Sequence, residues 1–133
     1  MAKMNPVVHF ELPAKDRNRM AEFYSGVFGW KTQVFGEEMG NYITVSTTET
    51  DKDGRPVTPG AINGGLYPAS KDDPNGNHPS LVIAVEDVNE HVKKLKKAGA
   101  KLLGEPTPIP GVGLWVSFID TEGNTMSILQ PKM

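Results

Sequence analysis

The chain has 133 residues, a formal net charge of −2 and no cysteine. This length suits one ordinary domain, and the lack of cysteine excludes disulfides, thiolate metal ligands and a cysteine nucleophile. Acidic and basic residues are interspersed, so we expect no nucleic-acid partner. The first ten residues hold no apolar segment typical of a secretory signal, and no run reaches membrane-spanning length. We therefore expect a cytoplasmic protein without a membrane partner.

The N-terminal part of the chain predicts a strand followed by a helix. Residues 7–12 (VVHFEL) carry β-branched and aromatic side chains, which predicts a strand that Pro13 ends. Asp16 is placed to cap the first turn of a helix, and Gly29 can supply its left-handed stop. Between these two residues, apolar side chains recur at helical spacing and predict one buried stripe, made of Met20, Phe23, Tyr24 and Val27.

Three predicted strands and two polar segments come next. The strands are expected at residues 31–35, 41–47 and 61–67. Residues 48–60 are too polar to bury, which indicates a long hairpin loop. Residues 68–79 are rich in Pro, Asn, Asp and Gly and are the best candidate for a linker.

After this linker the same succession of elements begins again. Residues 80–85 predict a strand, and Asp87 with Glu90 forms a capping box that opens a second helix. Gly99 is expected to end this helix, whose last turns are rich in lysine, as the helix dipole favours. The strands predicted after it are residues 101–103, 113–120 and 124–130.

The repeat is the strongest signal in the sequence. A shift of 71 positions places His9 on Ser80 and Asp16 on Asp87. Each half then contains one strand, one helix and three strands. The sequence therefore predicts an α+β fold of two tandem βαβββ modules within a single domain. The bounds are 1–133 for the domain, about 5–67 and 80–131 for the modules, and 68–79 for the linker.

Two motifs give the chain a family resemblance. Residues 22–30 (EFYSGVFGW), which follow His9 at a fixed spacing, and residues 120–124 (DTEGN) resemble the opening and closing signatures of the vicinal oxygen chelate superfamily. Residues 108–113 (PIPGVG) are similar to a run in its poorly characterised glyoxalase-like branch. The superfamily includes glyoxalases, bleomycin resistance proteins and extradiol dioxygenases. The resemblance implies curved sheets around a central cavity, with the helices outside, and a homodimer.

The resemblance also implies a divalent metal held by side chains from the first and last strand of each module. The equivalent positions here are His9, Asn63 or Gly64, Ser80 and Ser127. Only His9 is a good ligand, and this set has no carboxylate to offset the charge of a cation. We therefore expect no metal at the standard site and no cofactor. A divalent metal stays an alternative, through a site made of His9, Glu11 and His78.

Side chains on the first strand are the candidate catalytic residues. His9 and Glu11 are two positions apart, so they share one face of the strand. We hypothesise that Glu11 is a general acid or base with a raised pKa and that His9 assists it or binds the substrate. A structural hydrogen-bonded polar pair is the alternative. The residues expected to line the pocket are Tyr42, Asn63, Ser80, Trp115 and Ser127.

Three functions follow as hypotheses. The first is a glyoxalase-like protein that binds a small-molecule ligand in a pocket between its modules, either sequestering it or acting as a metal-independent enzyme. The second is a divalent-metal-dependent lyase, isomerase or dioxygenase of the vicinal oxygen chelate type. The third is a degenerate domain that binds another protein.

Overall fold

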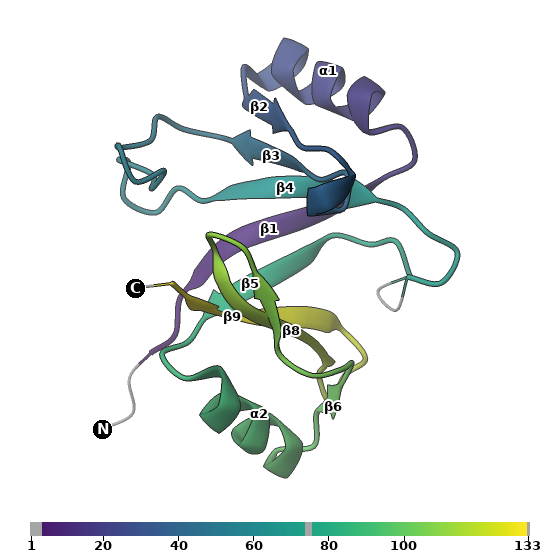
Figure 1. Cartoon of the computed structure of the whole chain (residues 1–133), viewed down its shortest axis with the longest axis vertical. Helices are drawn as coiled ribbons and strands as arrows, with labels where there is room; N and C mark the ends of the chain where they lie inside the picture. The colour runs from purple at the N-terminus through teal and green to yellow at the C-terminus, as the bar shows by residue number, and fades with distance from the viewer. Residues whose placement is uncertain (1–3, 74–75, 133) are drawn as a thin grey trace. The chain divides into compact units, whose positions relative to one another are not determined.

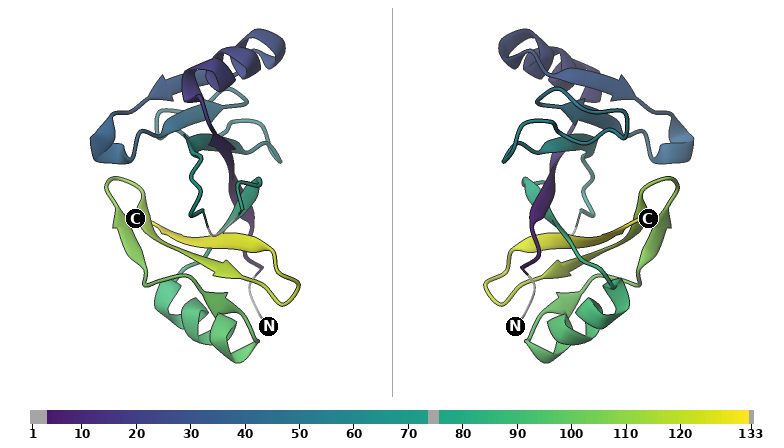
Figure 2. Two further views of the ribbon diagram at one scale, coloured as in Figure 1. Left: turned by 90° about the vertical axis from the view of Figure 1, so that its right-hand side faces the viewer. Right: turned by 90° about the vertical axis from the view of Figure 1, so that its left-hand side faces the viewer.

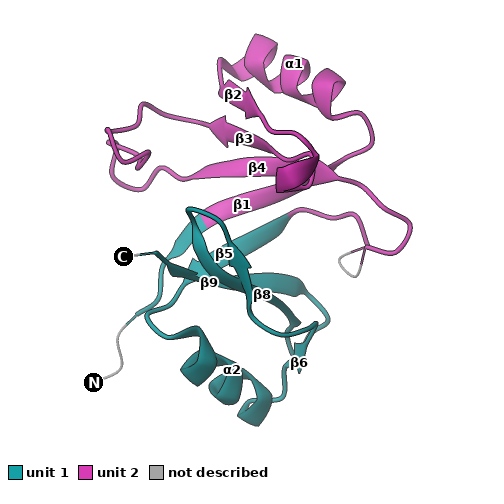
Figure 3. Ribbon diagram, in the orientation of Figure 1, with its two compact units in different colours: residues 1–8, 80–133 teal, residues 9–79 magenta. Residues whose placement is uncertain are grey.

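The computed structural model describes residues 4–73 and 76–132. The chain divides into two compact units (Figure 3). Unit 2 consists of His9–Pro79, and unit 1 consists of Met1–Val8 together with Ser80–Met133. Among the described residues, neither helix has the length and hydropathy that a membrane span requires.

Unit 2 contains one helix and a mixed sheet. Its strands lie in the order β2-β3-β4-β1 (Figure 1). Strand β1 runs parallel to β4, and the other neighbours in this sheet are antiparallel. The elements are β1 (Val7–Ala14), α1 (Arg17–Phe28), β2 (Lys31–Val34), the short 3-10 helix η1 (Glu37–Met39), β3 (Ile43–Ser46) and β4 (Asn63–Pro68).

The ends predicted for α1 are confirmed, whereas the end predicted for β1 is wrong. Asp16 accepts a hydrogen bond from the Arg19 backbone N–H at 3.0 Å, and Gly29 adopts a left-handed φ of 73°. Strand β1 continues through Pro13 to Ala14. It can do so because a proline costs a strand only the hydrogen bond that its missing N–H would have donated.

The buried face of α1 differs from the predicted apolar stripe. Phe23 and Val27 are 56% and 61% exposed, whereas Ala21 is buried against the sheet. Among the described residues of α1, Ala21 is the only buried one, so the stripe of the helix that faces the sheet is narrow. Tyr24 stacks on Trp30 beside it, with ring centroids 4.7 Å apart. The core consists of Ala21, Ile43, Val45 and Leu66, packed against Phe10, Leu12, Met20 and Trp30.

Unit 1 repeats this topology. Its strands lie in the order β5-β9-β8-β6, its first strand β5 is parallel to its last strand β9, and the additional strand β7 pairs with β8. The predicted repeat of one strand, one helix and three strands therefore recurs in space, and the α+β fold is confirmed. The elements are β5 (Ser80–Ala84), α2 (Val88–Lys97), β6 (Lys101–Leu102), β7 (Thr107–Ile109), β8 (Gly113–Ile119) and β9 (Thr125–Pro131).

The helix of unit 1 is capped from two directions. Asp87 accepts hydrogen bonds from the backbone N–H groups of Asn89 and Glu90, as the capping box predicts. Gln130, on β9, accepts a third from Val88 N–H at 2.9 Å. Figure 2 shows each helix along one face of its own sheet. The buried core of unit 1 consists of Val85, Val88, Val116, Phe118 and Ile128.

The start of the chain takes part in unit 1. Ala84 N–H donates a hydrogen bond to the Pro6 carbonyl at 2.9 Å. The imidazole Nε2 of His91, on α2, lies 3.3 Å from the side-chain oxygen of Asn5. These contacts join residues separated by more than seventy positions in the sequence.

Candidate functional site

The candidate site lies on the face of the unit 2 sheet that points away from α1, here called the helix-distal face. Phe10 and Leu12 pack into the core below α1, so His9 and Glu11 point to the opposite side, because side chains alternate along a strand. Strand pairing continues this face across β4 and β3. The helix-distal face thus consists of His9, Glu11, Tyr42, Thr44, Asn63 and Gly65.

A chain of hydrogen bonds joins three side chains on the helix-distal face. The Tyr42 hydroxyl lies 3.0 Å from His9 Nε2 and donates to Glu11 Oε2 at a longer distance of 3.4 Å. When Tyr42 donates to Glu11, the His9 tautomer with its proton on Nε2 completes the chain by donating to the phenol oxygen. In this arrangement the three half-buried groups donate their hydrogen bonds in one direction, from His9 to Tyr42 and from Tyr42 to Glu11.

Burial sets the protonation of this group. It lowers the pKa of His9 below its ordinary value, which favours the neutral imidazole. Burial also raises the pKa of Glu11; the hydrogen bond from Tyr42 opposes this rise, and the negative charge of Asp73 adds to it. The pKa of Tyr42 is raised by burial and then by the charge of Glu11. At neutral pH the site therefore holds a neutral phenol beside a carboxyl group that ionises at a higher pH than an ordinary glutamate.

The loop after β4 adds a second carboxylate, which the sequence analysis missed. The Tyr67 hydroxyl donates a hydrogen bond to Asp73 Oδ2 at 2.8 Å and so ties this loop to the end of β4. Asp73 lies in the segment predicted as a linker. The composition of that segment does not indicate that one of its acidic side chains raises the pKa of Glu11. Only the course of the folded loop reveals that contribution.

Strand register corrects the equivalence of the four superfamily ligand positions. Ser127 pairs with Val82, which lies 71 positions after Glu11, and Glu11 pairs with Gly65. The first-module equivalent of Ser127 is therefore Gly65, and the positions Asn63 and Gly64 taken from the sequence were wrong. A shift of one residue along a strand moves to the other face of the sheet, so Gly64 cannot be the position equivalent to Ser127.

These residues do not fit a divalent metal. The Asn63 side-chain oxygen accepts hydrogen bonds from Thr47, the Ser80 hydroxyl donates to the Thr125 carbonyl, and Gly65 has no side chain. The set has one imidazole and no carboxylate, which is weak ligation for a dication. Over residues 4–73 and 76–132 there is also no group of three or more His, Cys, Asp or Glu placed to hold a metal, so His9, Glu11 and His78 do not form one.

The other three predicted pocket residues belong to unit 1. Ser80 and Ser127 are buried, and the Ser127 hydroxyl lies 3.0 Å from that of Ser117. Trp115 pairs with Leu129 on the face of the sheet that points away from α2. The structure therefore brings His9, Glu11, Tyr42 and Asn63 together in one unit and places Ser80, Trp115 and Ser127 in the other. Their role in a pocket stays a prediction.

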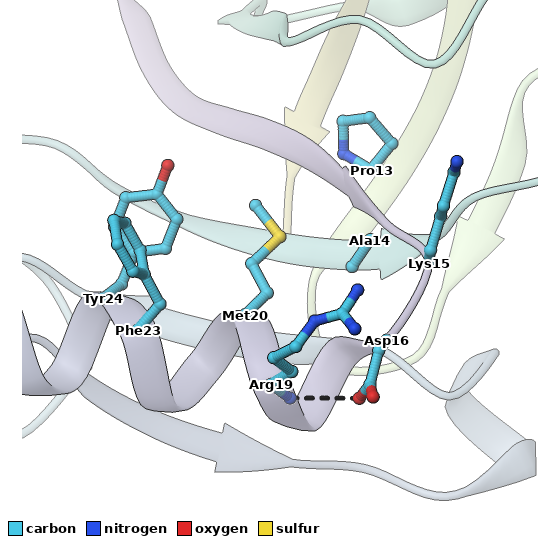
Figure 4. Close-up of a pocket in the computed structure, with 8 residues that line it drawn as sticks. All are labelled: Pro13, Ala14, Lys15, Asp16, Arg19, Met20, Phe23 and Tyr24. Atoms are coloured by element: carbon cyan, nitrogen blue, oxygen red, sulfur yellow. Dashed lines mark hydrogen bonds between the residues drawn. The ribbon is translucent and has the colours of Figure 1, made fainter.

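Two surface hollows lie elsewhere. A hollow of about 450 Å³ is found at the start of α1, where Asp16 caps the helix beside Arg19 (Figure 4). A second, of about 490 Å³, lies in unit 1 beside β7 and the ends of β8 and β9. Neither is lined by His9 or Glu11. Both are wide open to solvent, so we base the candidate site on the hydrogen-bonded groups of the helix-distal face.

In each unit the first strand runs parallel to the last, and the order of strands and helix is the same. Two such βαβββ modules are what the sequence motifs of the vicinal oxygen chelate superfamily led us to expect. The chain belongs to the Glyoxalase/Bleomycin resistance protein/Dioxygenase superfamily, whose family profile matches residues 7–128. The resemblance to the vicinal oxygen chelate proteins is thereby confirmed.

Relatives of known sequence agree with this assignment. The chain is 32% identical over 121 residues to a glyoxylase-like domain-containing protein of Didymella fabae, covering 89% of this chain and 88% of that protein. It is 26% identical over 127 residues to the anthracycline biosynthesis protein DnrV of Streptomyces peucetius, covering 90% of this chain. The chain spans only 44% of the length of DnrV.

Solved structures share the fold at low identity. The hypothetical protein BH1468 of Bacillus halodurans has a TM-score of 0.72 and 16% identity, with 98% of this chain and 97% of that chain covered. A methylmalonyl-CoA epimerase of Streptomyces coelicolor has a TM-score of 0.68 and 18% identity, with 96% and 97% covered. Identities this low show a shared fold and carry no statement about the reaction.

Proposed function

We propose that this glyoxalase-like protein binds a small neutral carbonyl compound at the helix-distal face of unit 2 and transfers a proton with Glu11, without a metal. The observation that carries the proposal is the hydrogen-bonded chain from His9 through Tyr42 to Glu11. Burial raises the pKa of Glu11, so its carboxylate is a stronger base than that of an ordinary glutamate, as proton removal from carbon requires. Superfamily membership supports a small-molecule ligand.

The proposed chemistry is proton removal next to a carbonyl group. The ionised Glu11 carboxylate takes a proton from the carbon α to the carbonyl. The electron pair of the broken C–H bond then delocalises onto the carbonyl oxygen and gives an enolate. A hydrogen bond from Tyr42 or from His9 Nε2–H would stabilise that oxygen. Neutral Glu11 then returns a proton to the same carbon, which regenerates the base and exchanges the α-proton with solvent; the configuration at that carbon inverts when the enolate turns its opposite face towards Glu11.

The charges around Glu11 indicate the class of ligand. Asp73 adds negative charge near Glu11, and the other group that acts on it is the Tyr42 phenol. Within the described part of unit 2, no cation shifts the pKa of Glu11 or Tyr42. A carboxylate or phosphate ligand would find no cation among the groups that act on Glu11 and Tyr42, which favours a neutral carbonyl compound.

Ligand binding and proton exchange test this proposal directly. Protein labelled with ¹³C on its side chains is screened by NMR against neutral ketones, aldehydes and 1,3-diketones, with the Glu11 carboxyl and His9 imidazole signals as reporters. We expect a subset of these compounds to shift both signals and to exchange an α-proton for deuterium in D₂O faster than buffer alone. Binding without exchange would favour sequestration. If no compound bound or raised the melting temperature, the protein-interaction hypothesis would replace this one.

The metal-dependent alternative has one observation in its favour, which is that His9 occupies a ligand position of the superfamily. Its test is the metal content of untagged protein after incubation with zinc, nickel, iron or manganese and subsequent gel filtration. Because the donor set does not fit a dication, we expect well below one equivalent of metal per chain. One tightly held equivalent that is lost in His9→Ala would establish the lyase or dioxygenase alternative instead.

We also propose that the protein is homodimeric and cytoplasmic; the superfamily resemblance supports the dimer. Light scattering coupled to gel filtration measures the mass in solution. A mass of twice 14.5 kDa is expected, and a single-chain mass at micromolar concentration would contradict the proposed dimer.

A further inference from the structure

We infer that Gly65 is a positioning residue, whose missing side chain allows the Tyr42 phenol to lie across β4 and place its hydroxyl between His9 and Glu11. This inference rests on the proposed function, because it assigns a role in preparing the same site. It concerns a residue that carries no chemistry of its own.

The first observation is steric. A Cβ atom built on Gly65 would overlap three atoms of Tyr42, namely its hydroxyl oxygen and the ring carbons Cζ and Cε2. The phenol therefore occupies the space that any other residue at position 65 would fill. Gly65 also pairs with Glu11 on β1 and with Thr44 on β3, so the ring lies over the centre of the sheet.

The second observation is that the backbone does not require glycine here. Gly65 is absent from the glycines with positive φ and sits in the regular ladder of β4, where an alanine would be accommodated by the main chain. A glycine inside a strand weakens the strand, since it adds backbone entropy to the unfolded state and offers no side chain to pack. Its presence is therefore explained by the aromatic ring above it and by nothing in the strand geometry.

The third observation is the consequence for the site. With the ring in place, the Tyr42 hydroxyl is 3.0 Å from His9 Nε2 and 3.4 Å from Glu11 Oε2. A Cβ at position 65 would push the far end of the Tyr42 side chain away, and both contacts would be lost together. The cost to the fold is small, because the atoms that must move are the tip of one side chain.

The neighbouring glycine provides a matched control. A Cβ on Gly64 would lie 2.5 Å from Cε1 of Phe10, on the face of the sheet that packs against α1. The two consecutive glycines thus each accommodate an aromatic ring, but on opposite faces. Gly64→Ala is expected to disturb the core and to leave the helix-distal face unchanged.

The experiment compares four variants by NMR: Gly65→Ala, Tyr42→Ala, the double variant that combines these two changes, and Gly64→Ala. The readouts are the nuclear Overhauser contacts between the Tyr42 ring and the His9 imidazole, and the pH titration of the Glu11 carboxyl carbon. In Gly65→Ala we expect these contacts to disappear and the Glu11 midpoint to move. In the Tyr42→Ala background, Gly65→Ala should move the midpoint no further. Gly64→Ala should lower the melting temperature and keep both site readouts.

Retention of the contacts and of the midpoint in Gly65→Ala would overturn the inference. If Gly65→Ala fails to fold, the double variant decides, because removing the Tyr42 ring should restore folding. Failure of both variants to fold would show that the clash is not with Tyr42 and would also overturn it.

Activity separates this inference from the proposed function. Where wild-type protein exchanges the α-proton of a neutral ketone, Gly65→Ala should slow exchange by about 10²-fold, the order that a misplaced group costs. If the wild-type protein exchanged no proton of any ketone, the proposed function would be refuted. Loss of the NMR contacts in Gly65→Ala would still support the positioning role of Gly65.

Discussion

Glu11→Gln is expected to slow proton exchange by about 10²–10⁴-fold, the range that a positioned general acid or base contributes. The amide has nearly the shape of the carboxyl group and can still accept a hydrogen bond from the Tyr42 hydroxyl, but it cannot take up a proton. Ligand binding should therefore survive while exchange is lost. The measurement is the rate of deuterium incorporation next to the carbonyl of a bound ketone. An unchanged rate would remove Glu11 from the mechanism.

The same variant should change how stability depends on pH. Because burial raises the pKa of Glu11 above its ordinary 4.5, the folded state holds this proton more tightly than the unfolded state does. The resulting stabilisation is complete below pH 4.5 and is lost as the pH rises through the raised folded-state pKa. Glu11→Gln should therefore gain stability relative to wild type as the pH rises, and urea denaturation between pH 4 and 8 measures this.

His9 contributes to stability in the opposite direction. Its pKa is lowered from 6.5 by burial, so its contribution is complete above pH 6.5 and is lost as the pH falls through the lowered folded-state pKa. Comparison of Glu11→Gln with wild type isolates the glutamate, since both proteins keep His9. If the stability difference between them did not vary with pH, the raised pKa of Glu11 would be contradicted.

The second large effect is expected at Gly113, the first residue of β8. Its φ is +146°, which side-chain-bearing residues rarely adopt, and a Cβ there would overlap the Gln130 carbonyl oxygen and lie 3.0 Å from the carbonyl carbon. Backbone atoms in a strand ladder cannot move aside as a flexible side chain can. Gly113→Ala should therefore lower the free energy of unfolding by about 1–3 kcal/mol for the backbone strain and by a further ~1–3 kcal/mol for the overlap.

Gly104→Ala is the matched control for this substitution. Gly104 has a φ of +143°, yet a Cβ at that position meets no atom within 4 Å. Both variants place an alanine at nearly the same positive φ, and only Gly113→Ala adds the collision with β9. The difference between their free energies of unfolding, measured by urea denaturation, should therefore equal the contribution of the overlap. Equal losses would show that the backbone conformation, and not the contact with Gln130, requires glycine at position 113.

Local sequence signals predicted the ends of the helices well. Asp16, Gly29 and Asp87 act through atoms at most four residues away, so short-range chemistry determines them. The exposed side of α1 could not be predicted, because Phe23 is as apolar as the partly buried Met20 and only contact with the sheet distinguishes them. Strand β7 was missed because it has three residues with a proline at its centre and is defined by its pairing with β8.

The candidate site was partly predictable for a similar reason. The alternation of side chains along one strand placed His9 and Glu11 on the same face. The bridging position of Tyr42 depends on the register of β3 against β4, and the sequence does not determine that register to one residue. Gly65 was missed because a residue without a side chain gives no chemical signal until the ring above it is seen. Asp73 acts on Glu11 through the fold of a loop that has no periodic pattern.

The contacts that Asn5 and Pro6 make within unit 1 have a consequence for the order in which the parts of the protein can fold. A ribosome synthesises these residues before unit 2, whereas their partners Ala84 and His91 emerge only after the whole of unit 2. Unit 2 is continuous in sequence, so it can fold while synthesis proceeds, whereas unit 1 must bring together two segments that the whole of unit 2 separates in the sequence. Asn5 and Pro6 therefore leave the ribosome before unit 2 but reach their final contacts only after unit 2 has been made.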